Sequence, residues 1–238
     1  MADELGATIL GVWAHPDDEA YLSAGLMARA VRNGSRVVCV TATRGEGGSL
    51  DEEKWPPETM AEVRTTELEK SLGILGVTDH HWLDLPDKDM QTGLPESGYG
   101  PVLDLVADLQ PDTILTFGPE GMTGHEAHKS VSGWAVRALR EAGKPGARVL
   151  FACVTPDWAE EFLPAWEPFN VFLPGTPHVV PREELEIHYE LPPDILETKV
   201  NAINAHVSQI ESILAAVGDE VWWREMSLEA FRLGEEKE

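Results

Sequence analysis

Two groups of histidine and aspartate residues could do chemistry together in this chain. The first is the stretch His-Pro-Asp-Asp-Glu at residues 15–19, directly after an apolar run at residues 8–13. His15 and Asp18 stand where a strand would turn into a helix, so both side chains can reach one ion. Asp17 between them is then free to act as a base. The alternative is that one of these carboxylates simply caps the helix N-terminus.

The second group is Gly-His-Glu-Ala-His at residues 124–128, after an expected strand at residues 113–117. His125 and His128 lie three positions apart, on one face of a helix. Such a pair alone is a weak metal signal. Both groups, however, follow the carboxyl ends of strands, where open parallel sheets bind their ligands. We therefore expect them to face one crevice.

Two histidines and one aspartate, with water in the fourth position, suit Zn²⁺ at a catalytic site. The same ligand types can hold Fe²⁺. Cys39 and Cys153 lie inside apolar, strand-like runs and are expected to pack as small hydrophobic residues. The sequence thus favours an open catalytic metal site over a closed structural one.

Alternating strand and helix patterns predict the elements that must position these residues. The alternation indicates a parallel sheet with right-handed crossovers, in a Rossmann-like three-layer α/β/α domain. The expected strands are residues 8–13, 36–42, 81–83, 113–117 and 148–154, and the expected helices are residues 18–32, 58–75, 102–109 and 128–142.

The C-terminal third is expected to add irregular structure. Residues 185–191 alternate like an antiparallel or edge strand, and residues 194–217 suggest one long helix. No repeat or linker interrupts the sequence, so residues 1–238 are interpreted as a single domain.

The charge balance excludes several classes of partner. The chain has 42 acidic and 18 basic residues and a formal net charge of −24. A field of this sign repels phosphate backbones and anionic lipids, so nucleic acid is an unexpected partner. The acidic start of the sequence does not resemble a signal peptide, and no apolar run suggests membrane insertion. We expect a cytoplasmic protein and leave a homo-oligomer open.

Four motifs in order resemble the LmbE-like, or PIG-L, family of N-deacetylases. The first two are Ala-His-Pro-Asp-Asp-Glu at residues 14–19 and the Thr-Arg-Gly-Glu loop at residues 43–46. The others are Arg-Thr-Thr-Glu at residues 64–67, followed by Leu-Gly-Val, and Ala-His-Val-Ser-Gln at residues 205–209. The family includes deacetylases of N-acetylglucosaminyl conjugates.

The resemblance implies a role for each matching residue. It implies three metal ligands, His15, Asp18 and His128. Asp17 would be the general base that takes a proton from the water held by the metal, and a protonated His125 would stabilise the oxyanion. Two further residues would contact the substrate, Arg64 and Asp84.

The implied reaction is the metal-dependent removal of an N-acyl group, with N-acetyl favoured, from a small sugar-containing molecule. Two residues depart from the family pattern: Ala127 replaces an aspartate that could orient His125, and Thr123 stands where some members carry a tyrosine. An alternative is therefore a catalytically impaired protein that still binds metal or ligand. A non-haem Fe²⁺ oxygenase shares the ligand types but fits less well with a free Asp17.

Two other features have open interpretations. The aromatic residues between positions 158 and 169 could cover the crevice and stack on a sugar ring, but packing of an irregular segment is the more frequent explanation. They are Trp158, Phe162, Trp166 and Phe169. His206 could equally pack in the core or lie behind the site.

Overall fold

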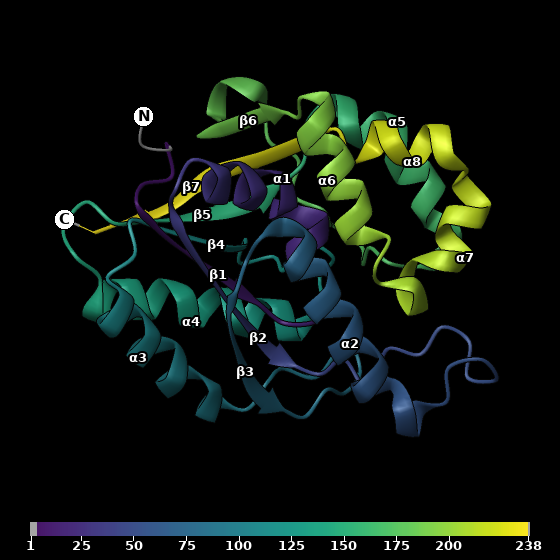
Figure 1. The fold of residues 1–238 in the computed structure, drawn as a ribbon, viewed down its shortest axis with the longest axis horizontal. Coiled ribbons are helices and arrows are strands. Elements are labelled where there is room, and N and C mark those ends of the chain that lie inside the picture. Colours follow the sequence, from purple (N-terminus) through teal and green to yellow (C-terminus); the bar gives the residue numbers. More distant parts are fainter. Residues whose placement is uncertain (1–3, 238) are drawn as a thin grey trace.

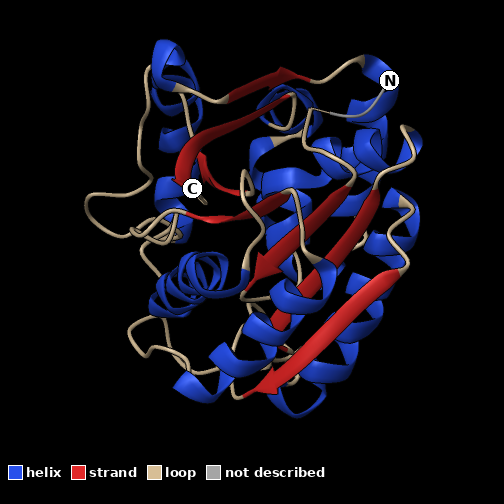
Figure 2. Ribbon diagram, turned by 90° about the vertical axis from the view of Figure 1, so that its left-hand side faces the viewer, coloured by secondary structure: helices blue, strands red, loops and turns tan. Residues whose placement is uncertain are grey.

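A seven-stranded sheet forms the centre of the computed structural model, which describes residues 4–237 (Figures 1 and 2). The strand order is β3-β2-β1-β4-β5-β7-β6. The first five strands are parallel, β7 runs antiparallel to β5, and β6 runs antiparallel to β7. The strands are β1 (Thr8–Trp13), β2 (Arg36–Thr43), β3 (Asp79–Leu85), β4 (Thr113–Phe117), β5 (Arg148–Cys153), β6 (Ile187–Glu190) and β7 (Leu228–Glu236).

Helices cover both faces of this sheet. On one side α3 packs on α4, and α4 contacts β1 and β4; on the other side α1 packs against α2 and α6 (Figure 1). The helices are α1 (Asp18–Arg32), α2 (Pro57–Leu75), α3 (Tyr99–Leu109), α4 (Glu126–Ala142), α5 (Pro156–Trp166), α6 (Pro193–Ile203), α7 (Val207–Val217) and α8 (Asp219–Glu225). Among the residues described, no helix combines the length and the apolar character needed to cross a membrane.

The expected three-layer, mostly parallel fold is confirmed. The central strands β1 and β4 are mostly apolar and buried over almost their whole length, because helices cover the sheet on both sides. From β1 the chain adds β2 and β3 in one direction and then returns to add β4 and β5 in the other. The carboxyl ends of β1 and β4 therefore flank the switch point, where such sheets place their ligands.

The C-terminal part builds a second, smaller apolar cluster beside the main core. Its buried members come from α1, α5, α6, α7, α8 and the residue after α8: Ala20, Trp166, Val200, Ile203, Ile210, Ile213, Trp222 and Met226. The edge strand expected at residues 185–191 is confirmed as the antiparallel β6. The sequence patterns did not predict α5, α8 or β7.

The prediction of one long helix over residues 194–217 is wrong. The helix stops at Ile203, and a new helix begins at Val207. The backbone N–H of Ser208 at the start of α7 donates to Glu67 Oε1 at 2.7 Å, and its hydroxyl donates to Glu67 Oε2 at 2.7 Å. A carboxylate from α2 therefore satisfies backbone donors that the break leaves free.

Candidate metal centre

His15, Asp18 and His128 meet at the switch point between β1 and β4. His15 Nδ1 lies 3.1 Å from His128 Nε2 and 3.7 Å from Asp18 Oδ2, and His128 Nε2 lies 3.5 Å from Asp18 Oδ1. All three residues are buried. Ligands at about 2.0–2.1 Å from a tetrahedral Zn²⁺ stand about 3.3 Å apart. The three side chains therefore form a group that could hold one metal ion.

The hydrogen bonds of His128 leave the correct nitrogen free for a metal. His128 Nδ1 donates to the backbone carbonyl of Gly121 at 2.8 Å, so its proton is on that side. Nε2 then carries the lone pair and faces His15 and Asp18. The ring also stacks on Phe117, with 4.0 Å between centroids and 9° between planes. This packing fixes the direction in which Nε2 points.

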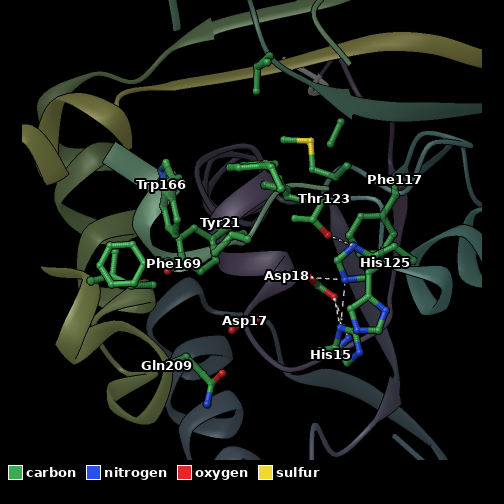
Figure 3. A pocket seen from close by; sticks show the side chains of 18 of the residues that line it. His15, Asp17, Asp18, Tyr21, Phe117, Thr123, His125, Trp166, Phe169 and Gln209 are labelled. Carbon is green, nitrogen blue, oxygen red and sulfur yellow. Dashed lines mark hydrogen bonds and ion pairs between the residues drawn. The ribbon is translucent and has the colours of Figure 1, made fainter. Parts of the chain in front are cut away.

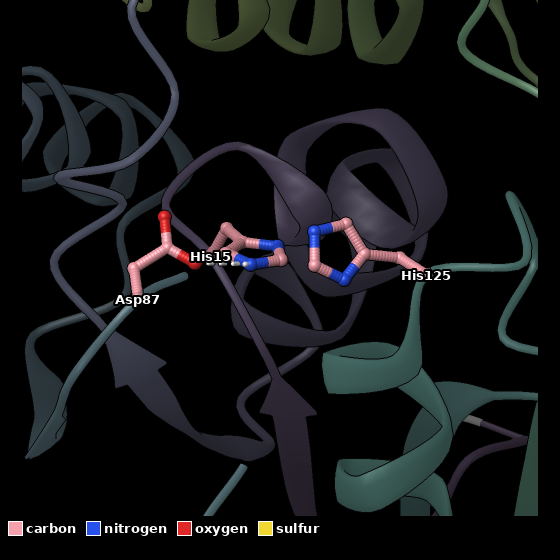
Figure 4. A group of neighbouring side chains, drawn as sticks. All are labelled: His15, Asp87 and His125. Carbon is pink, nitrogen blue, oxygen red and sulfur yellow. Dashed lines mark ion pairs between the residues drawn. The ribbon is translucent and has the colours of Figure 1, made fainter. Parts of the chain in front are cut away.

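His15 is held in a similar way, by a carboxylate. Its Nε2 lies 3.4 Å from Asp87 Oδ1 (Figure 4), whereas the nitrogen near Asp18 is Nδ1. Burial lowers the pKa of His15, but the carboxylates of Asp87 and Asp18 outweigh this and raise it overall. A proton attracted to Nε2 by Asp87 leaves Nδ1 free to face the metal position.

Neither Asp17 nor Asp18 caps the N-terminus of α1 with its side chain. Asp18 Oδ2 instead accepts the backbone N–H groups of Ala14 and His15, at 3.1 and 2.8 Å. Asp17 occupies the N-cap position of α1 without a side-chain cap bond, and its φ of 108° is unusual for a residue with a side chain. Strain of this kind is concentrated at functional sites. The geometry therefore disfavours the interpretation of Asp17 as a simple cap.

Arg64 lies under Asp17. Its Nη2 donates to Asp17 Oδ2 at 3.1 Å and to the carbonyl of Pro16 at 2.5 Å, and its Nη1 donates to the carbonyl of Gly45 at 3.1 Å. Burial raises the pKa of Asp17 to about 6, although the Arg64 guanidinium opposes this. Arg64 was expected to contact substrate. Its side chain borders the pocket, but its bonds to Pro16 and Asp17 hold the turn that carries Asp17, and its bond to Gly45 holds the loop after β2.

His206 lies behind this turn. Of the two roles that the sequence left open, packing in the core or a position behind the site, the structure supports the second. His206 is fully buried, and its Nε2 lies 3.3 Å from Glu19 Oε1. Glu19 Oε2 in turn accepts the backbone N–H of Asp17 at 3.2 Å. The C-terminal motif therefore supports the first motif from behind, through Glu19.

His125 points toward the same centre from the N-terminus of α4. Its Nδ1 accepts the backbone N–H of Ala127 at 3.2 Å, so in the neutral ring the proton is on Nε2. Burial, with His15 and His128 nearby, lowers the pKa of His125 to about 3. A protonated His125, as the family resemblance implies, does not agree with these surroundings.

His15, Asp87 and His125 also lie close enough to form a second metal-ligating group (Figure 4). This group shares His15 with the first. The lone pair of His125 Nδ1 is already engaged by Ala127, and the proton on Nε2 blocks the other nitrogen. The first group, whose histidine nitrogens are oriented by carbonyl and carboxylate partners, is the better metal site.

The structure does not bring Asp84 into the site. Its carboxylate pairs with Arg44 at 2.8 Å and is 65% exposed. Asp87, three residues later, borders the pocket instead and was not singled out from the sequence. A signal for it existed, because Asp87 follows the carboxyl end of β3 after a proline, as Asp17 follows β1.

A pocket of about 390 Å³ opens beside the candidate metal centre (Figure 3). Histidine and aspartate side chains line one end of it, while Tyr21, Trp166 and Phe169 lie toward the other end. Among the four aromatic residues noted in the sequence, Trp158, Trp166 and Phe169 line the pocket. Phe162 is buried in packing instead. Three of the four residues therefore border the pocket and Phe162 serves packing, while stacking on a sugar ring stays a prediction.

Comparison with known families and proteins agrees with the motifs. The family model of the PIG-L, or GlcNAc-PI de-N-acetylase, family matches residues 10–139, more than half of the chain. A 1D-myo-inositol 2-acetamido-2-deoxy-alpha-D-glucopyranoside deacetylase of Corynebacterium glutamicum is 30% identical over 236 residues, covering 87% of this chain and 77% of that protein. The enzyme of the same name from Kineococcus radiotolerans is 33% identical over 168 residues, which span 59% of this chain and only 46% of that protein.

Solved structures share the fold at low sequence identity. The N,N'-diacetylchitobiose deacetylase of Pyrococcus horikoshii matches with a TM-score of 0.66 and 20% identity, covering 96% of this chain and 84% of that chain. The 4-carboxy-2-hydroxymuconate hydratase of Pseudomonas putida matches with a TM-score of 0.63 and 14% identity, covering 95% and 94%. Because a hydratase has this fold too, the fold alone does not specify the reaction.

Proposed function

The chain belongs to the PIG-L (GlcNAc-PI de-N-acetylase) family, and on that premise we propose that it is a metal-dependent hydrolase that removes the N-acetyl group from an N-acetylglucosaminyl conjugate. The observation that carries this proposal is the convergence of His15, Asp18 and His128 beside an acidic side chain, Asp17, in one pocket. The names of the curated relatives supply the substrate class.

The three proposed ligands fit a small divalent cation. Two imidazole nitrogens and one carboxylate, about 3–4 Å apart, are a donor set for catalytic Zn²⁺, and Fe²⁺ is the alternative. When bound, the metal would polarise the amide carbonyl and bring the pKa of a water to about 7. We propose Zn²⁺ because the site can bind it in a tetrahedral arrangement.

We assign to Asp17 the transfer of the proton that amide hydrolysis requires. As general base it takes a proton from the attacking water, whose oxygen forms the new bond to the carbonyl carbon. When the carbon–nitrogen bond breaks, Asp17 gives that proton to the leaving amine. Arg64 and Glu19 hold the Asp17 turn in place from below and behind. This chemistry fits an amide hydrolase better than an oxygenase, which has no need of such a base.

His125 would act as a neutral hydrogen-bond donor. Its Nε2–H is the free polar group of the ring, since Nδ1 is engaged by Ala127. A donor aimed at the carbonyl oxygen as it gains negative charge is typically worth about 3–4 kcal/mol. We therefore keep the role of oxyanion stabilisation for His125 but assign it to the neutral imidazole. The aspartate that Ala127 replaces is not required for this.

The proposal is tested by following free amine and acetate after incubation of the metal-loaded enzyme with methyl N-acetylglucosaminide. We expect release by the wild type and a loss of about 10²-fold or more in Asp17→Asn, which should retain its metal. Asp84→Asn is the matched control, because Asp84 is an exposed aspartate outside the pocket, and it should behave as wild type. No release by a metal-loaded wild type would instead support the catalytically impaired alternative.

A further inference from the structure

The pocket continues past the candidate metal centre into a second region, which we call the apolar arm. The arm is lined by side chains from α5, the segment after it, α7 and the residue after α8: Trp158, Trp166, Phe169, Val171, Phe172, Ile213 and Met226. Several of them also belong to the second apolar cluster. Figure 3 shows Trp166, Phe169 and Tyr21 on the side of the pocket away from His15. Neither the metal ligands nor Asp17 accounts for this part of the pocket.

The pocket lining also includes three ionisable residues, Glu225, Lys199 and Glu229. Glu225 is 3% exposed, and its Oε1 accepts the indole N–H of Trp166 at 2.5 Å. Its Oε2 has no hydrogen-bond partner among the described residues, although it is buried and the residue lines the pocket. A buried carboxyl oxygen without a partner is costly, and a ligand that donates a hydrogen bond removes that cost.

Lys199, whose charge acts on the Glu225 carboxyl group, is already engaged in another ion pair. Lys199 donates to Glu229 Oε1 at 2.9 Å, and both side chains are 1% exposed. Glu229 also accepts the backbone N–H groups of Gly25 and Leu26, at 2.7 and 2.8 Å. The charge of Lys199 is thus matched within its own pair. Glu225 is left with an unpartnered carboxyl oxygen, Oε2, in the lining of the pocket.

We propose that the apolar arm binds an apolar substituent of the substrate, such as an alkyl chain or an aromatic ring, that ends in a hydroxyl or another hydrogen-bond donor directed to Glu225. This inference rests on the proposed function and deepens it, because it names the chemistry of the conjugate. A polyhydroxylated substituent fits the arm poorly, since each buried hydroxyl would need its own partner in a wall of aromatic and aliphatic side chains.

The substituent can belong to the sugar side of the amide, as the aglycone, or to the acyl side. Two substrate series distinguish these two positions. In the first, the acyl group stays acetyl and the sugar carries a methyl, butyl, hexyl or 6-hydroxyhexyl aglycone. In the second, the aglycone stays methyl and the acyl group is acetyl, butanoyl, hexanoyl or 6-hydroxyhexanoyl. In the series whose variable chain enters the arm, kcat/KM should rise about fourfold for each methylene group that is buried there. The hydroxyl-terminated member should be preferred over the alkyl-terminated member of equal length.

The variant Glu225→Met removes the acceptor and keeps the length of the side chain. It should reverse the preference between the hydroxyl-terminated and alkyl-terminated members of the responding series. Glu161→Gln is the matched control, because Glu161 is a half-exposed carboxylate of α5 that pairs with Arg224 and does not border the pocket. This control should leave both the preference and the basal rate unchanged.

A kcat/KM that is flat in both series, while the methyl N-acetylglucosaminide is still deacetylated, would overturn the apolar arm and leave the proposed function intact. Calorimetric titration of the metal-loaded Asp17→Asn protein with the same compounds tests the arm independently of turnover. Affinities that rise with chain length support it even if no compound is hydrolysed. Equal affinities across both series refute it.

Discussion

Replacing Glu225 by glutamine (Glu225→Gln) should raise the unfolding free energy relative to wild type as the pH rises from 5 to 8. Burial raises the pKa of Glu225 to about 7, although the Trp166 hydrogen bond and the charge of Lys199 oppose this. Three elements face this carboxyl group: α5 through Trp166, α6 through Lys199 and α1 through Tyr21. None of them supplies Glu225 with an unmatched cation, so ionisation of the buried group is expected to cost stability.

The sign and size of the effect follow from proton linkage. The ordinary pKa of a glutamate, 4.5, applies to the unfolded chain, so between pH 4.5 and about 7 the folded protein binds more protons than the unfolded one. The contribution of the protonated carboxyl group is complete below pH 4.5 and is lost as the pH rises through 7. A shift of this size corresponds to about 3 kcal/mol in all. Of this, about 2.5 kcal/mol is lost between pH 5 and 8.

Urea denaturation of wild type and Glu225→Gln at pH 5, 6, 7 and 8 measures this contribution. Other titrating groups are common to both proteins and largely cancel in the difference between the two unfolding free energies. The unfolding free energy of the glutamine variant minus that of the wild type should increase by about 2.5 kcal/mol from pH 5 to pH 8. A difference that stays constant over this range would refute the argument that Glu225 is buried without compensation.

Three further changes test other contacts. Lys199→Met should lower the unfolding free energy, measured by urea denaturation, by about 3–5 kcal/mol, because it leaves the carboxylate of Glu229 buried without its cation. Adding Glu229→Gln should restore part of this loss. If it restores nothing, the pairing of Lys199 with Glu229 is contradicted. Arg64→Met should reduce kcat by roughly tenfold or more with unchanged metal content, because Asp17 loses its support; an unchanged kcat would contradict that role. Ser208→Ala should cost about 1 kcal/mol by the same denaturation assay, and a neutral effect would mean that its hydroxyl bond to α2 is not stabilising.

Much of the fold could be predicted because local patterns and tertiary packing agree. The buried strands are mostly apolar runs, and the turns after β1 and β4 carry the histidines and aspartates at the carboxyl edge of the sheet. This rule alone placed His15 and His128 in one crevice. The same rule points to Asp87 after β3, whereas the family resemblance points to Asp84.

The features that escaped prediction depend on partners distant in sequence. The break between α6 and α7 has helical periodicity on both sides and occurs where Glu67 of α2 caps a new N-terminus. The strand β7 is rich in charged residues, and its place in the sheet is set by antiparallel pairing with β5 and β6. Glu225 belongs to a short acidic helix that resembles a solvated one in the sequence. Its burial follows from the packing of Trp166 and Trp158 against it.

The most direct test of the account is a metal titration of the metal-free enzyme. Zn²⁺ is added in steps while bound metal and free-amine release from methyl N-acetylglucosaminide are measured on the same samples. We predict that activity rises linearly and stops rising at about one ion per chain. His128→Ala should show neither tight binding nor activity, whereas His81→Ala, which removes an exposed histidine of β3, should match the wild type. Amine release without metal, or stoichiometric binding by His128→Ala, would contradict the central claim.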